Sequence, residues 1–144
     1  MIIMIVRDVM VREVVATNPD TSIKKAAEIM MQHHIGSLIV LENEKISGII
    51  TETNIMHAVA EEKNPDATAV SDVMSKDVIT VEPDKRIEDA VELMLKYKIK
   101  KLPVVDDEKL IGVITASDII VVEPKLIEAV ASLVSIKIPG YQGG

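Results

Sequence analysis

Residues 112–120 read GVITASDII, and residues 48–56 read GIITETNIM. In each stretch a short apolar run starts at a glycine, ends at a threonine, and leads into polar residues that favour the start of a helix. Each stretch therefore predicts a buried strand that turns directly into a helix. The two stretches differ in the polar residues after the threonine, and Asp118 in the later stretch is Asn54 in the earlier one. The sequence contains two versions of one local structure, 64 positions apart.

The same offset relates most of the chain to itself. The sequence DVM occurs at residues 8–10 and again at residues 72–74, and Pro19-Asp20 falls on Pro83-Asp84. Between residues 6–56 and their counterparts, 20 positions are identical, where unrelated segments would share about three or four. The chain is therefore an internal duplication.

Each copy predicts the order β-α-β-β-α. An extended piece opens the copy, at residues 13–19 and 77–83. The helix that follows has apolar residues at the spacing of an amphipathic helix, and we expect Asp20 and Asp84 to be its N-caps. Two strands joined by a polar turn come next, and a second helix begins after Thr51 and after Thr115. The helical apolar positions are Ile23, Ala26, Ala27, Met30 and Met31 in the first copy and Ile87, Ala90, Val91, Met94 and Leu95 in the second.

One such copy is too small to bury its own sheet and helices, whereas two copies can complete a core together. The predicted fold class is therefore α/β of the α+β type, with two β-α-β-β-α repeats packed about a pseudo-two-fold axis. The predicted boundaries are repeat 1 at 6–62, a linker at 63–69, repeat 2 at 70–122, a C-terminal helix at 123–135 that Pro124 opens, and a flexible tail at 136–144.

Composition excludes several classes of function. The chain has 144 residues and a net charge of −7, which argues against a nucleic-acid partner. It has no cysteine and 1% aromatic residues, so disulfides, thiolate chemistry and aromatic stacking platforms are excluded. No apolar run is long enough to span a membrane, and residues 1–10 lack the cationic region of a signal peptide. The cytoplasm is the expected compartment.

The duplicated unit resembles a known family. DVM before the opening strand, LPVVDD at 102–107 and GVITASD at 112–118, in this order and repeated, resemble the tandem cystathionine-β-synthase (CBS) domain pair, or Bateman module. The resemblance covers residues 6–120. It implies a regulatory module that binds AMP, ADP, ATP, S-adenosylmethionine or a relative in clefts between the repeats, and that often dimerises as a flat disc.

The resemblance also implies site residues. Asp118 matches the family's ribose-binding aspartate, and Lys100 and Lys101 match basic residues that reach the ligand's phosphates. Base contacts are expected from the segment at 10–14 and from the residues before the middle strand of the other repeat. The implied base-contact residues are Met10, Arg12, Ile35 and Gly36.

The residues themselves are compatible with these roles and with simpler ones. A strand-to-helix turn exposes free N–H groups that favour an anion, Thr115 and Ser117 add hydroxyl donors, and a carboxylate accepts hydrogen bonds from a sugar diol. Capping of the helix explains Thr115 and Asp118 equally well. The two lysines could be a solvated pair, and Met10 and Ile35 could be plain core.

The first copy predicts a weaker second site. Thr51 and Asn54 lack the charged acceptor, and Gly36-Ser37 replaces the lysine pair. A neutral amide accepts a hydrogen bond from ribose less strongly than a carboxylate does. The sequence thus predicts two unequal sites, the stronger one around Asp118.

No catalytic or metal-binding constellation is found. His33, His34 and His57 have no metal-ligand spacing, and no nucleophile motif or phosphate-binding loop is present. We therefore predict a non-catalytic adenine-nucleotide sensor that requires no cofactor, forms a homodimer and acts on an unknown regulated protein. The alternative is a ligand-free module for oligomerisation or protein docking.

Overall fold

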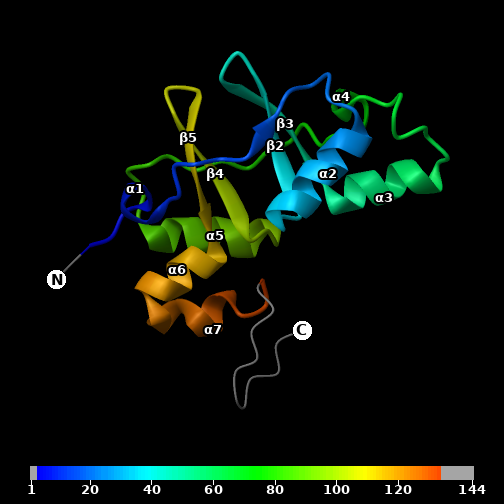
Figure 1. Ribbon diagram of the computed structural model, residues 1–144. Coiled ribbons are helices and arrows are strands. Elements are labelled where there is room, and N and C mark those ends of the chain that lie inside the picture. Colours follow the sequence, from blue (N-terminus) through cyan, green and yellow to red (C-terminus); the bar gives the residue numbers. More distant parts are fainter. Residues whose placement is uncertain (1–2, 134–144) are drawn as a thin grey trace. The chain divides into compact units, whose positions relative to one another are not determined.

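The computed structural model describes residues 3–133 (Figure 1). These residues form two compact units. One consists of residues 15–78 and is called the Asn54 unit; the other combines residues 3–14 with residues 79–133 and is called the Asp118 unit. The predicted C-terminal tail at 136–144 lies outside the described residues.

The Asn54 unit is a three-stranded sheet with two long helices. Its elements are β1 (Ala16–Thr17), α2 (Ile23–His33), β2 (Ser37–Glu42), β3 (Lys45–Thr51), α3 (Glu52–Ala60) and α4 (Val70–Val73). The strand order is β1-β2-β3, with β1 parallel and β3 antiparallel to β2. The predicted helical spacing is confirmed in α2, whose Ile23, Ala26 and Met30 are buried beneath the sheet residues Leu38, Val40 and Ile50.

The Asp118 unit repeats this design with a smaller sheet. Its elements are α1 (Val6–Val9), α5 (Ile87–Tyr97), β4 (Lys101–Asp106), β5 (Lys109–Thr115), α6 (Ala116–Val122), a 3₁₀ turn (Pro124–Leu126) and α7 (Ile127–Val130). β4 and β5 form an antiparallel hairpin, and the opening segment joins β4 only through a single parallel bridge at Val81. Ile87, Ala90, Val91 and Met94 of α5 are buried against this hairpin.

The opening helix of each repeat packs in the unit built by the other repeat. In the Asp118 unit the Val6 amide donates to the Lys85 carbonyl (2.7 Å), and in the Asn54 unit the Val70 amide donates to the Thr21 carbonyl (2.7 Å). These two bonds are equivalent at the offset of 64. The predicted repeat boundaries describe the sequence duplication, whereas each compact unit contains the opening helix of the other copy.

Two glycines make this exchange possible. A Cβ on Gly112 would lie 2.9 Å from the Val11 carbonyl oxygen, and a Cβ on Gly48 would lie 2.8 Å from the Ser75 carbonyl oxygen. Both distances are shorter than real Cβ contacts. The docked segment therefore runs so close to β5 or β3 that a side chain at the glycine is excluded.

Three local predictions require correction. The N-caps of α2 and α5 are Ser22 and Arg86, because the Pro-Asp dipeptides turn the chain just before each helix. Asp20 and Asp84 lie in those turns, two residues before the N-caps. Most of each expected opening strand is irregular, apart from β1 and the bridge at Val81. The expected helix at 123–135 begins as the 3₁₀ turn and continues as α7 only to Val130.

Candidate ligand-binding site

The candidate site is built where β5 turns into α6. Thr115 ends β5 and caps α6, its hydroxyl oxygen accepting from the Asp118 amide at 3.1 Å. Ala116 and Ile119 are fully buried and fix the helix on the unit, which leaves Ser117 exposed and Asp118 half-buried. Because α6 has only seven residues, its dipole is a small source of positive potential.

The Asp118 carboxylate has no role in this cap. Within residues 3–133, no hydrogen bond or ion pair reaches its carboxylate oxygen atoms; the bond in this cap is made by the backbone amide of Asp118, which donates to the Thr115 hydroxyl. A half-buried carboxylate without a partner can accept two further hydrogen bonds, such as those from adjacent hydroxyls. The local structure positions Asp118 without consuming its acceptor capacity.

The corresponding asparagine is fully engaged by its own unit. The Asn54 Oδ1 atom accepts from the Thr51 backbone amide (2.8 Å) and from the Thr51 hydroxyl (2.9 Å), while the Asn54 backbone N–H donates to that hydroxyl (3.1 Å). The Asn54 Nδ2 group donates to the Ser75 hydroxyl (3.4 Å). This closed capping box stabilises α3. A ligand would have to break part of it to bond the side-chain amide group of Asn54.

Lys100 and Lys101 lie beside the start of α6. The Lys100 carbonyl accepts from the Ala116 amide (2.9 Å), and Lys101 is the register partner of Thr115 across the hairpin. The Lys100 side chain is exposed, while Lys101 is half-buried. Burial, and then the neighbouring charge of Lys100, lower the pKa of the Lys101 ammonium. Two cations therefore stand next to the Asp118 turn, and one of them is poorly solvated.

Met10 and Arg12 reach the same unit through the opening segment. Val11 exchanges two backbone hydrogen bonds with Val113 of β5 (2.8 and 2.9 Å), which holds Met10 buried against Gly112 and leaves Arg12 exposed. Met10 is thus a core residue of the Asp118 unit. Arg12 adds a third cation to the segment beside β5.

Ile35 and Gly36 belong to the Asn54 unit, so their predicted contacts with a ligand at Asp118 stay predictions. In their own unit the Gly36 carbonyl accepts from the Glu52 amide (3.1 Å), and a Cβ on Gly36 would lie 3.4 Å from the Glu52 carboxyl group. Sequence reasoning did not single out Glu52 or Ser75. At the offset of 64 they align with the apolar residues Ala116 and Val11, so the polar side chains specific to the Asn54 unit could have been found by comparing the two copies.

The described residues provide neither a metal site nor a membrane-spanning helix. Residues 3–133 contain no cluster of three or more His, Cys, Asp or Glu side chains that could hold a metal ion. No helix within that range is long and apolar enough to cross a membrane.

Comparisons with known proteins agree with the duplicated architecture. A family model of the CBS domain matches residues 6–61 and again residues 70–124. An uncharacterized protein of Methanopyrus kandleri is 41% identical over 122 residues, covering 83% of this chain and 62% of that protein, so the chain spans less than two thirds of that relative. The CBS domain-containing protein YhcV of Bacillus subtilis is 33% identical over 116 residues, covering 81% of this chain and 83% of YhcV.

A solved structure matches the same architecture. The CBS domain pair of protein MJ0100, in complex with 5′-methylthioadenosine and S-adenosyl-L-methionine, aligns with a TM-score of 0.75 and 30% identity over 85% of this chain and 98% of that chain. The family model alone covers most of the chain as two consecutive domains. The chain therefore belongs to the CBS domain family and is a tandem CBS domain pair.

Proposed function

We propose that this CBS pair is a non-catalytic regulatory module that binds an adenine nucleotide at the Asp118 turn. One observation carries the proposal: the Asp118 carboxylate is positioned and half-buried but accepts no hydrogen bond within the described residues. The duplicate position shows what a purely structural residue does there, because Asn54 closes its own cap. The adenosine-type ligands of the MJ0100 domain pair support the ligand class.

The charges near Asp118 favour a phosphate-bearing ligand such as AMP, ADP or ATP, with S-adenosylmethionine as the alternative. The carboxylate would accept from the ribose hydroxyls, and Lys100, Lys101 and Arg12 would pair with phosphate oxygens. An anion next to Lys101 favours the charged ammonium and raises its lowered pKa. Binding of a phosphate should therefore be accompanied by proton uptake near the pH at which Lys101 titrates.

The Asn54 turn is proposed as the weaker second site. A ligand there must compete with the Thr51–Asn54 cap, and the carboxyl group of Glu52 stands beside Gly36 where the other copy has lysines. Both features lower the affinity for a phosphate. Titration calorimetry should give one strong site per chain, and two equal sites would contradict the asymmetry.

Regulation requires that the ligand distinguishes two arrangements of the module. We propose that the module acts as a homodimer on a separate regulated protein. Each unit exposes large apolar side chains on its helices, which are available for self-association. They are Met31, Met56 and Val59 in the Asn54 unit and Leu95, Val121 and Val122 in the Asp118 unit.

Thermal melting with AMP, ADP, ATP and S-adenosylmethionine tests the ligand proposal. A ligand at 100 times its Kd should add about 2.7 kcal/mol, or about 5–10 °C for a chain of this length. Asp118→Ala should abolish the gain and leave the unliganded melt nearly unchanged, because its carboxylate has no partner to lose. The matched control Asn54→Ala should lower the unliganded melt and keep the gain.

Two results would contradict the proposal. If Asp118→Ala retains the full gain, the carboxylate does not hold the ligand. If the melt is indifferent to all four compounds but depends strongly on protein concentration, the module is a ligand-free association domain.

A further inference from the structure

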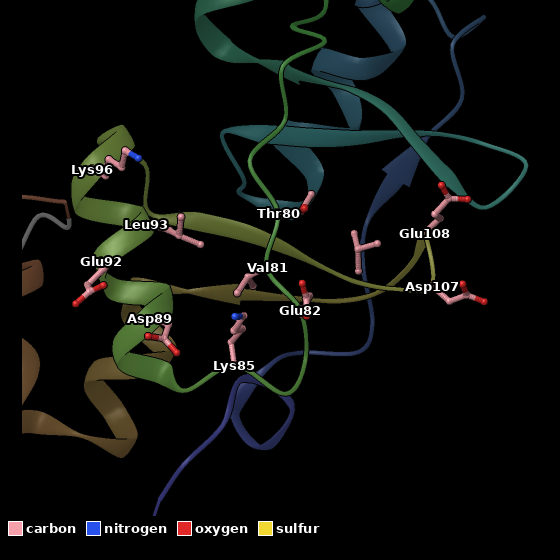
Figure 2. Close-up of a pocket in the computed structure, with 11 residues that line it drawn as sticks. Thr80, Val81, Glu82, Lys85, Asp89, Glu92, Leu93, Lys96, Asp107 and Glu108 are labelled. Atoms are coloured by element: carbon pink, nitrogen blue, oxygen red, sulfur yellow. The ribbon is translucent and has the colours of Figure 1, made fainter.

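The Asp118 unit contains an open groove whose lining includes none of the predicted ligand-binding residues. Its volume is about 720 Å³. Figure 2 shows that it is bordered by α5, by the segment that carries Thr80 and Glu82, and by the β4–β5 turn with Asp107 and Glu108. Val81, Leu93 and Val105 contribute apolar surface between these borders. The groove is therefore a second concave surface of the unit, separate from the proposed nucleotide site.

An unpaired sheet edge runs along this groove. The backbone of Val81 is hydrogen-bonded to β4: its N–H group donates to the Pro103 carbonyl (3.0 Å), and its carbonyl accepts from the Val105 amide (3.0 Å). In a parallel pair, the residues on either side of such a residue direct their N–H and C=O groups the other way. Within the described residues, the backbone N–H and C=O groups of Thr80 and the N–H group of Glu82 have no partner. An edge of this kind accepts an additional extended strand.

The groove is strongly acidic. Its lining includes five carboxylate side chains and two lysines. The Lys96 ammonium lies over the Tyr97 ring, 5.3 Å from the ring centroid, and is thus partly engaged. An incoming chain must therefore be cationic to complement the field of the groove.

Part of the acidic character is not shared by the two copies. At the offset of 64, Glu82, Asp89 and Asp107 correspond to Asn18, Lys25 and Asn43, whereas Glu92 and Glu108 correspond to Glu28 and Glu44. Leu93 and Val105 correspond to the apolar residues Ile29 and Leu41. Three of the five carboxylates are thus specific to this copy, which is the difference expected of a binding surface rather than of a folding requirement.

We propose that this groove binds an extended, lysine- or arginine-bearing segment of a partner polypeptide, which adds a strand to the open edge at residues 80–82. Backbone hydrogen bonds at Thr80 and Glu82 would fix the direction of the segment. Its basic side chains would meet Asp89, Glu92 and Asp107, and alternate apolar side chains would lie on Leu93 and Val105. The proposal concerns a surface other than the nucleotide site and does not depend on nucleotide binding.

The test uses the full chain and a labelled synthetic peptide that alternates lysine and valine over seven residues, measured by fluorescence anisotropy at low salt. The expected binding weakens as salt is raised. The double variant Glu82→Lys/Glu92→Lys should weaken binding on the order of tenfold or more. The matched control is Glu28→Lys, which reverses the charge at the position equivalent to Glu92 on α2 of the Asn54 unit and should leave binding unchanged.

A second peptide separates strand addition from simple charge attraction. N-methylation of alternate amides keeps every charge but removes the donors that would pair with the edge. Weaker binding of the methylated peptide, with amide shifts in NMR spectra at residues 80–85 and on α5, supports the proposal. Equal binding of both peptides, full competition by spermine, or equal binding by the Glu82→Lys/Glu92→Lys variant would overturn it, as would no binding of the unmodified peptide.

Discussion

Replacing Gly112 by alanine tests whether the exchanged opening helix is held as closely as the structure indicates. The new Cβ would lie 2.8 Å from the Met10 sulfur and 2.9 Å from the Val11 carbonyl oxygen. The end of the Met10 side chain is flexible and can move away. The Val11 carbonyl is held in place, because Val11 exchanges two backbone hydrogen bonds with Val113. The opening segment must therefore shift away from β5.

The magnitude follows from two opposing terms. Overpacking of this kind costs about 1–3 kcal/mol. The loss of glycine's freedom in the unfolded chain returns about 0.4–1 kcal/mol. We expect a net loss of about 1–2 kcal/mol in the free energy of unfolding, measured by urea denaturation, and a Tm lower by about 2–8 °C.

Two further substitutions complete this experiment. Gly36→Ala is the control, because its nearest contact is the flexible Glu52 side chain at 3.4 Å, and it should be neutral or slightly stabilising. Adding Met10→Ala to Gly112→Ala should not restore stability, since the backbone clash with Val11 remains. If Gly112→Ala is as stable as the wild type, the close docking of residues 10–11 on β5 is wrong.

Four other predictions follow from the packing, the caps and the charges. Met94→Ala should cost about 2–5 kcal/mol in urea denaturation because Met94 is fully buried, whereas exposed Leu95→Ala should cost less than about 0.5 kcal/mol. Thr115→Ala should cost about 1 kcal/mol, as the loss of an N-cap; no measurable loss would contradict the cap. Since the pKa of Lys101 is lowered in the folded state, the unfolded chain binds more protons between that pKa and the ordinary lysine value, so stability should rise with pH across this window. Lys101→Met should flatten that rise in pH-dependent melting, and an unchanged rise would assign it to other groups. Val59→Lys should lower the dimer fraction in sedimentation experiments if the apolar surface on α3 is an interface.

Much of the fold could be predicted from periodicity because the elements involved are decided locally. The apolar spacing of α2 and α5, the two hairpins, and the helix starts after Thr51 and Thr115 depend only on neighbouring residues, and all are confirmed. The N-caps were displaced because the Pro-Asp dipeptide is as good a turn former as aspartate is a cap. Local sequence cannot decide between these two uses of Asp20.

The exchange of the opening helices could not be predicted from local pattern, because both copies contain the same DVM sequence. The family resemblance implied it only indirectly, by assigning Met10 and Arg12 to the Asp118 site, and the tertiary structure shows which helix packs on which sheet. The acidic groove was also missed, since its lining comes from three separate segments. The hydrogen bonds of the two caps explain how Asp118 and Asn54 differ: the Asn54 side chain is bonded within its cap, whereas the Asp118 carboxylate is not.

The crossed placement of α1 and α4 has a consequence for how the chain is made. Synthesis proceeds from the N-terminus, so residues 15–78 can close into a complete unit as soon as they emerge. Residues 3–14, with the apolar side chains of Val6 and Met10, find their sheet only after residues 79–133 have left the ribosome. Residues 3–14 are thus made well before the sheet on which they fold, and deleting them would damage the Asp118 unit first.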